Sequence, residues 1–283
     1  MRKLSKEKRV RVLAALVEGN SIRSTVRMTG VAKNTVVKLL EDIGKVCIEY
    51  QDKKLKNLTC KRIECDEIWS FCYSKQKNVP KDKKGEFGYG DVWTWVAIDS
   101  DTKLTLSWLV GLRDADHAKV FMNDIKGRLS NKVQLTTDGL RAYMEAVDEA
   151  FGNDIDYAML VKLYGLEKTE AGKYSPPKCI GARRQSLIGN PKAEHVSTSY
   201  IERQNLTMRM SMRRFTRLTN GFSKKIDNLE YAIALHFMYY NFVRIHRTLK
   251  VTPAMEAGVT KRLWNIGDIV ELLEEKERNM SSN

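Results

Sequence analysis

The stretch Lys61-Arg-Ile-Glu-Cys-Asp-Glu-Ile-Trp-Ser-Phe-Cys72 carries the strand pattern that decides the fold class. Ile63, Cys65, Glu67 and Trp69 alternate with Glu64, Asp66, Ile68 and Ser70. This alternation predicts a β-strand whose neighbouring side chains point to opposite faces. An unpaired carboxylate in an otherwise buried strand is costly unless it holds a cation, so Asp66 is a candidate metal ligand. Its neighbour Glu67 is expected on the other face, so that only one of the two could serve a given site.

Further elements follow this strand in an order typical of a mixed α/β sheet. Strands are predicted over 92–98, 104–110 and 132–136, and helices over 114–129 and 141–150. A second acid, Asp138, follows the last of these strands, at the strand end where α/β sheets form ligand sites. An aspartate that only caps the next helix is an equally good interpretation of Asp138.

The net charge of +14 is spread unevenly over the 283 residues. Residues 1–60 carry 14 Lys and Arg against 6 Asp and Glu, whereas residues 61–160 carry 14 against 17. An acidic centre between basic flanks is typical of a protein that binds a polyanion and collects carboxylates at one place. A cationic soluble protein with no such partner is the alternative.

Composition excludes several other classes of protein. Hydrophobic residues make up 42% of the chain and charged residues 30%, which excludes a disordered chain. The longest uncharged apolar stretch, 231–243, is too short to span a bilayer, and the N-terminal stretch has no secretory h-region. The five cysteines form no C-x-x-C pair, so neither a disulfide framework nor a zinc finger is indicated.

The first 50 residues have the pattern of a helix-turn-helix. Helices are predicted over 7–17, 21–30 and 32–43, and residues 51–57 are predicted to be a polar linker. An ordinary three-helix bundle with a basic face is the alternative, but the charge of the segment favours DNA binding. The third helix would present side chains suited to phosphate and base-edge contacts, namely Lys33, Asn34, Thr35 and Lys38.

A third acid, Glu202, lies near the start of a basic helix predicted over 200–215. Ser199 and Glu202 fit a capping box, in which Glu202 would only cap this helix. Arg209 is predicted two turns further on the same face, and an acid beside a basic stripe suits a site that holds a metal and grips a phosphate backbone. Spacing alone does not decide between these two interpretations.

Five motifs in this order closely resemble the bacterial and archaeal transposases of the insertion-sequence-one family, over about residues 21–254. That family belongs to the Asp-Asp-Glu recombinases, so the resemblance implies a ribonuclease-H-like mixed sheet flanked by helices. Members of the family often have a zinc finger before the helix-turn-helix, but this sequence has no Cys/His cluster suited to form one. The motifs are Asp66-Glu-Ile-Trp-Ser-Phe71, Thr137-Asp-Gly139, Tyr200-Ile-Glu-Arg-Gln-Asn205, the run 214–224, and the run 236–246 with Thr252-Pro-Ala254.

The resemblance implies that Asp66, Asp138 and Glu202 are the catalytic residues and metal ligands. They would hold two Mg²⁺ ions, or Mn²⁺ as a substitute, roughly 3.5–4 Å apart for in-line attack at phosphorus. Water would attack first to cut the transposon end, and the freed 3′-hydroxyl would then join that end to target DNA. The arginines expected to clamp DNA are Arg203, Arg209, Arg213, Arg214 and Arg217.

These inferences divide the chain into a helix-turn-helix DNA-binding domain (1–50), a linker (51–60), a catalytic domain (61–254) with a basic insertion at about 161–198, and a helical tail (255–283). The expected partners are double-stranded DNA, at transposon ends and target, and further copies of the chain on paired ends. The expected location is the prokaryotic cytoplasm, at the nucleoid. Two alternatives stay open: a helix-turn-helix regulator without catalysis, and a metal-dependent nuclease of the same fold.

Overall fold

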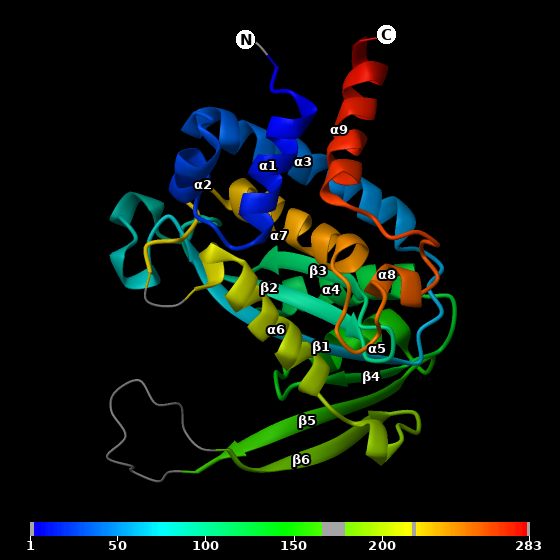
Figure 1. Ribbon diagram of the computed structural model, residues 1–283. Helices are drawn as coiled ribbons and strands as arrows, with labels where there is room; N and C mark the ends of the chain where they lie inside the picture. Colours follow the sequence, from blue (N-terminus) through cyan, green and yellow to red (C-terminus); the bar gives the residue numbers. More distant parts are fainter. Residues whose placement is uncertain (1–2, 166–178, 217–218, 282–283) are drawn as a thin grey trace.

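The computed structural model describes residues 3–165, 179–216 and 219–281, in which six strands form one mixed sheet (Figure 1). The strand order is β3-β2-β1-β4-β5-β6; β1 pairs antiparallel with β2 and parallel with β4, and β4 pairs parallel with β5. The predicted mixed α/β class is confirmed. The strands are β1 (Arg62–Cys72), β2 (Gly90–Asp99), β3 (Thr105–Gly111), β4 (Gln134–Thr137), β5 (Asp156–Tyr164) and β6 (Cys179–Ile188).

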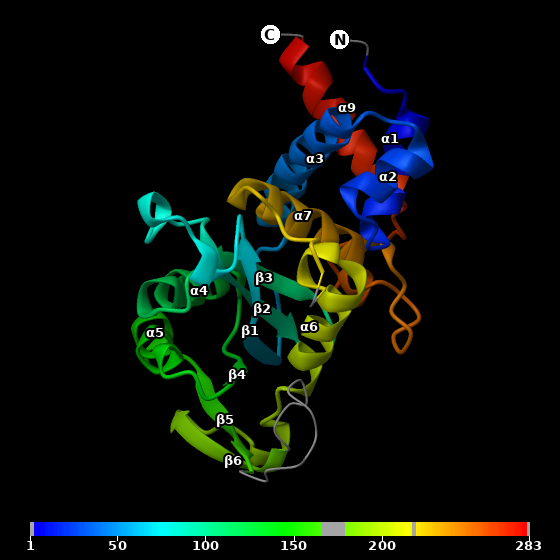
Figure 2. The ribbon, with the colours of Figure 1, turned by 90° about the vertical axis from the view of Figure 1, so that its left-hand side faces the viewer.

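Helices cover both faces of the sheet (Figure 2). On one face lie α4 (Ala115–Arg128) and α5 (Ala142–Phe151), and here the ring of Trp95 packs against Phe121 and Tyr143. On the other face lie α6 (Ser199–Ser211) and α7 (Ile226–Met238), which a short π-helical turn, η5 (Tyr239–Val243), continues. The sheet is therefore buried on both sides near β1, where the expected site begins.

Part of the insertion expected as a basic loop over 161–198 is sheet. It contains the end of β5 and all of β6, which pairs antiparallel with β5 at the edge of the sheet. Most side chains of β6 are exposed or half-buried, so backbone hydrogen bonds rather than apolar burial hold the strand in place. The sequence of β6 therefore lacks the apolar alternation that would have identified it. Residues 166–178 of the insertion lie outside the described residues.

Three helices precede the sheet: α1 (Lys6–Val17), α2 (Ile22–Thr29) and α3 (Lys33–Lys54). Between α2 and α3, Gly30 has a φ of 68°, a left-handed conformation that glycine adopts without strain. The first two helices were predicted closely, but the third was predicted to end at residue 43, and the polar linker at 51–57 was wrong, because α3 continues to Lys54. The buried Gln51 packs against α7 and donates a hydrogen bond to the Ala234 carbonyl at 3.1 Å.

The C-terminal helices return to the N-terminal ones. After the short α8 (Pro253–Glu256), α9 (Ile266–Ser281) packs beside α1 and α3, so that the first and last helices of the chain lie side by side (Figures 1 and 2). The buried Arg9 of α1 pairs with Glu277 of α9 at 3.3 Å. Among the described residues, no helix combines the length and apolar character needed to cross a membrane.

The contact between α3 and α7 depends on Gly44. A Cβ atom at this position would lie 2.3 Å from the Cβ and 2.6 Å from the Cα of Tyr231, which side-chain rotation cannot relieve. We expect Gly44→Ala to lower the free energy of unfolding by about 1–3 kcal/mol, measured by urea denaturation. Gly127→Ala is the matched control, because no atom lies within 4 Å of a Cβ there, and it should not destabilise. Equal stability of the two variants would contradict this packing.

Candidate functional site

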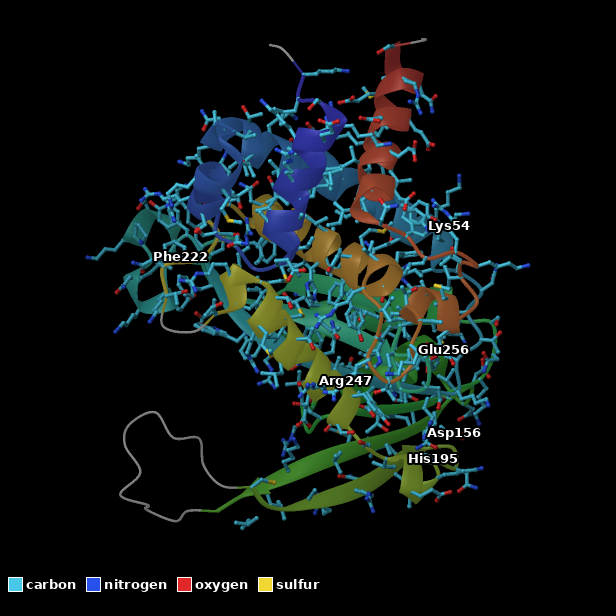
Figure 3. The ribbon with its side chains drawn as sticks, viewed as in Figure 1. Lys54, Asp156, His195, Phe222, Arg247 and Glu256 are labelled. Atoms are coloured by element: carbon cyan, nitrogen blue, oxygen red, sulfur yellow. The ribbon has the colours of Figure 1, made fainter. Side chains whose placement is uncertain are left out.

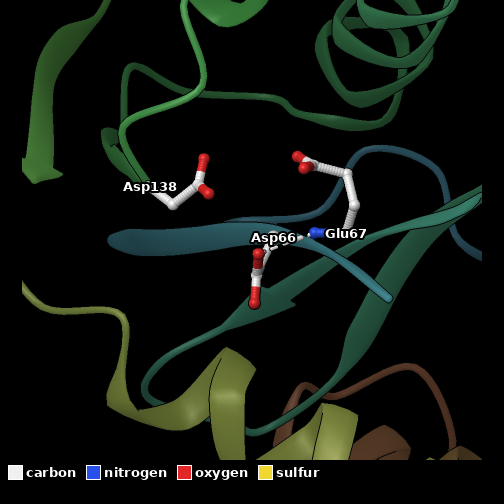
Figure 4. A group of neighbouring side chains, drawn as sticks. All are labelled: Asp66, Glu67 and Asp138. Atoms are coloured by element: carbon white, nitrogen blue, oxygen red, sulfur yellow. Dashed lines mark hydrogen bonds between the residues drawn. The ribbon is translucent and has the colours of Figure 1, made fainter. Parts of the chain in front are cut away.

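Asp66 and Asp138 lie side by side where β1 and β4 run parallel. Cys65 is paired in register with Thr137, so the residue that follows each of them is an aspartate. One carboxylate oxygen from each of Asp66, Glu67 and Asp138 lies within 4.8 Å of the other two (Figure 4). The two acids singled out 72 residues apart in the sequence are thus neighbours, and a third acid joins them.

The expectation that Glu67 could not share a site with Asp66 was wrong. The two side chains do leave opposite faces of β1, with Asp66 toward α6 and Glu67 toward the other side (Figure 4). Their carboxylate oxygens nevertheless come within 4.8 Å of each other and of Asp138. Alternation fixes the direction in which a side chain leaves the strand but not where a long, flexible carboxylate ends.

Glu202 lies on α6, outside this group of three acids. Its helix is anchored on β1 by Asn205, whose amide donates to Asp66 Oδ2 at 2.9 Å. Glu202 is less than one turn away, near enough for its charge to raise the pKa of Asp66. Its carboxylate pairs with Lys162 Nζ of β5 at 2.5 Å and accepts a hydrogen bond from the Thr198 hydroxyl.

The capping box at the start of α6 is not formed, because Glu64 of β1 takes its place. Glu64 Oε2 accepts the backbone N–H groups of Tyr200 and Ile201 at 2.8 and 3.0 Å, and Oε1 accepts the Ser100 hydroxyl at 3.2 Å. The helix also ends at Ser211, earlier than predicted, before a short 3-10 turn. A buried carboxylate of β1 therefore fixes the helix that carries Glu202.

Replacing Glu64 should loosen α6. We expect Glu64→Ala to lower the free energy of unfolding by about 1–3 kcal/mol, because it leaves buried donors without their charged acceptor. Glu64→Gln keeps the shape and should cost less, and the exposed Glu194→Ala should leave stability unchanged. Thermal unfolding of the three variants measures the difference. A Glu64→Ala protein as stable as Glu194→Ala would contradict the anchoring role.

The carboxylates repel one another in a buried setting. Burial, followed by the charge of Asp138, raises the pKa of Asp66 to about 6 and the pKa of Glu67 to about 7. The donor set consists of oxygen atoms only, which are the ligands that Mg²⁺ and Mn²⁺ prefer. A divalent cation would relieve exactly this kind of crowding, so the residues present fit such a metal.

Arg113, which follows β3, holds two of these acids. Its Nε donates to Glu67 Oε2 at 2.9 Å, and its terminal nitrogen lies 3.5 Å from Asp138 Oδ2. Its guanidinium also lies over the ring of Trp93, 4.9 Å from the centroid. Four residues of the site were not predicted as its members: Arg113, Glu67, Glu64 and Asn205. Only Glu67 and Asn205 carried a signal in the sequence, as parts of quoted motifs.

The expected DNA-contacting residues have different environments. On α3, Lys33, Asn34 and Lys38 are exposed and Thr35 is half-buried, with Lys38 paired to Asp42 at 2.8 Å. On α6 and the turn after it, Arg203 and Arg213 are exposed and Arg209 is half-buried. Arg214 instead donates to the Ser223 hydroxyl at 2.6 Å, and burial lowers its pKa to about 10. Arg217 lies outside the described residues.

Comparison with known proteins gives two distant structural similarities. No family model and no curated protein matches the sequence. The chain is similar to a piggyBac transposase in a synaptic complex with hairpin DNA, with a TM-score of 0.46 and 10% identity over 96% of this chain and 71% of that one. It is also similar to a Mos1 mariner paired-end complex with Mn, with a TM-score of 0.29 and 11% identity over 84% and 77%. Because both similarities are this remote, they carry no conclusion about the function of this chain.

Proposed function

We propose that this chain is a DNA transposase of an insertion sequence, with a ribonuclease-H-like catalytic core that cuts transposon ends and joins their 3′-hydroxyls to target DNA. The observation that carries the proposal is the meeting of Asp66 and Asp138 at the ends of neighbouring parallel strands, under a helix that brings Glu202 toward them. The strongly basic composition supports a nucleic-acid substrate.

Asp66, Asp138 and Glu202 are the proposed ligands of Mg²⁺, and Mn²⁺ is the proposed substitute. When bound, the metal would act as a Lewis acid on the DNA phosphate and lower the pKa of the attacking hydroxyl. To take part, Glu202 must turn away from Lys162, a surface pair that costs little to break. Asn205 keeps Asp66 oriented through its amide, and Arg113 keeps Asp138 close to Glu67.

The basic side chains around the site are proposed to position DNA. Arg203 and Arg209 continue along α6 from Glu202, so they can hold the phosphates that flank the reacting one. The exposed N-terminal part of α3, with Lys33 and Asn34, is the proposed reader of the transposon end, in a helix-turn-helix formed by α2 and α3. Because α3 continues into the contact with α7, the reader and the catalytic core would move as one body.

A cleavage and joining assay tests the function. The substrate is a plasmid carrying the gene of this chain with its native flanking DNA, incubated with the protein and Mg²⁺ beside a labelled second DNA. The proposal expects nicks that leave 3′-hydroxyls at the element's ends, followed by joining of those ends to the labelled DNA. Cleavage without joining would indicate a nuclease instead, and binding with neither reaction would indicate a regulator.

Metal binding should depend on pH because the carboxylates must lose their protons. Asp66 and Glu67 have folded-state pKa values above their ordinary ones, so they bind protons more tightly in the folded chain than in the unfolded one. Their contribution to stability is therefore greatest at acidic pH and is lost as the pH rises from about 4 to about 7. We expect Mn²⁺ to raise the unfolding temperature at pH 8 and much less at pH 5. An equal rise at both pH values, or the same rise in Asp66→Asn, would contradict the site.

A further inference from the structure

A row of aromatic side chains leads away from the carboxylates along the sheet. Trp69 lies two residues after Glu67 on β1 and so points to the same face, and in register it lies directly opposite Trp93 of β2. Phe71 follows on that face, and its ring centroid is 5.8 Å from that of Trp69. The ring of Phe222 lies 4.9 Å beyond Phe71. We call Trp69, Trp93, Phe71 and Phe222 the aromatic strip.

The last member of the strip is brought in from a distant part of the chain. The segment between α6 and α7 runs beside the end of β1, where the Tyr73 amide donates to the Ser223 carbonyl at 2.8 Å. Figure 3 labels Phe222 on this segment. All four rings of the strip are only half-buried, unlike Trp95 on the same face of β2, which α4 and α5 cover completely. The strip therefore leaves part of its aromatic surface exposed.

Basic side chains lie over one of these rings and in the segments next to the strip. The guanidinium of Arg113, which binds Glu67 and Asp138, lies over Trp93. The loop over 73–89, between β1 and β2, carries five lysines and two acids, and in it Lys83 lies over the ring of Tyr89 and pairs with Glu86 at 3.2 Å. Lys224 and Lys225, which follow Phe222 in the chain, are exposed. An acid, Asp91, lies opposite Phe71 in register.

We propose that the aromatic strip binds unpaired DNA bases beside the reacting phosphate, by stacking them on its rings. Half-exposed rings with cations at their margins are what single-stranded nucleic acid requires, since each base has a π-face and each phosphate a negative charge. Bases inside a duplex are covered by their neighbours, so only unstacked bases can lie on the strip. Asp91 disfavours a phosphate at Phe71 but not the face of a base.

This inference rests on the proposed function for its substrate, because a strand being cut and joined supplies unpaired bases next to the carboxylates. It adds a surface that distinguishes bases from the phosphate backbone. The strip begins two residues from Glu67 and lies on the face of β1 opposite the one from which Asp66 leaves toward α6. The pairing of β4 with β1 ends at Cys65, so a DNA strand whose phosphate lies at the carboxylates would pass the edge of β1 to place its nearest bases on Trp69 and Trp93. The test therefore compares DNA that has bases with DNA that lacks them.

The test measures binding without metal, in EDTA, by fluorescence anisotropy of three labelled DNAs of equal length: oligo-dT, an abasic strand with the same phosphates, and a duplex. We expect the wild-type protein to bind oligo-dT about tenfold more tightly than the abasic strand. Trp69→Leu and Trp93→Leu should each lose about tenfold on oligo-dT and change less than about twofold on the abasic strand. Trp108→Leu is the matched control, since it removes a half-buried indole of β3 that packs against Phe237, and it should retain the preference.

Several results would overturn the strip as a base-binding surface. Equal affinity of the wild-type protein for oligo-dT and the abasic strand would leave charge alone as the cause of binding. Self-association that is lost in Trp69→Leu and Trp93→Leu, measured by sedimentation, would make the strip a contact between copies of the chain. If thermal unfolding shows that either tryptophan variant is not folded, Phe222→Leu, in a surface segment, takes its place. This variant should show the same loss of affinity for oligo-dT.

The outcome is separable from that of the proposed function. A chain that prefers oligo-dT in EDTA but neither cuts nor joins DNA in Mg²⁺ would refute the transposase and keep the strip. A chain that cuts and joins but binds both strands equally would refute the strip alone.

Discussion

Asp66→Asn is expected to lower metal-dependent cleavage by about 10³-fold or more and to leave DNA binding intact. The substitution keeps the size of the side chain but removes the charge through which the carboxylate would hold a cation, and phosphoryl transfer relies on charge stabilisation of this magnitude. DNA binding would depend instead on the proposed lysines and arginines, which the change does not touch. Cleavage is measured on DNA with the element's ends in Mg²⁺, and binding by gel shift in EDTA.

The control for this variant is Asp116→Asn, which removes the same charge from an exposed position in the first turn of α4. Its cleavage should stay within about twofold of wild type, since it lies outside the cluster. An Asp66→Asn protein that still nicks the ends in Mg²⁺ would refute the assignment of Asp66. A variant that no longer binds DNA would show that Asp66 supports the fold rather than the chemistry.

Glu202→Gln is expected to lower cleavage as strongly as Asp66→Asn, whereas Glu67→Gln should lower it only about 10- to 100-fold. Glu202 is the proposed third ligand, although in this structure it pairs with Lys162. Glu67 has a fully buried side chain bound by Arg113, so we assign it to orienting the site rather than to holding the metal. Both substitutions replace a glutamate carboxylate by an amide, so each variant is the control for the other.

A greater loss of cleavage in Glu67→Gln than in Glu202→Gln would change the assignment of the third metal ligand. If Glu67→Gln abolished cleavage and Glu202→Gln kept it, the metal would be held by the three acids that already lie within 4.8 Å of one another. Metal titration separates binding from chemistry here. A true ligand variant should require more Mg²⁺ for the same rate, whereas an orienting residue mainly affects the maximal rate.

Local pattern was sufficient for most of the fold. The strand that carries Asp66 alternates clearly, and the helices α4 and α5 show apolar spacing, so their positions were predicted within a few residues. Two strands were missed: β5, whose end lies in the segment taken as an insertion, and the edge strand β6, which buries few side chains and is defined by backbone pairing with β5. The linker at 51–57 was wrong because polarity marks Gln51 as a surface residue, whereas it is buried and its amide nitrogen donates to the Ala234 carbonyl of α7.

The residues of the candidate site were predicted only where they lay in a motif. Asp138 directly follows a strand, and parallel pairing of β4 with β1 then places it beside Asp66. Arg113 and Glu64 could not be found in this way, since each acts on residues far away in the sequence through a contact that only the folded chain creates. The capping box at Ser199 was misleading for the same reason, because Glu64 of another element binds the free N–H groups.

The most direct test of the central claim is a crystal of the protein soaked in Mn²⁺ and measured at a wavelength where manganese scatters anomalously. The account predicts an anomalous peak coordinated by Asp66 and Asp138, which is lost in crystals of Asp66→Asn. The account would be contradicted if Mn²⁺ bound only elsewhere, or if saturating Mn²⁺ left no peak at these carboxylates.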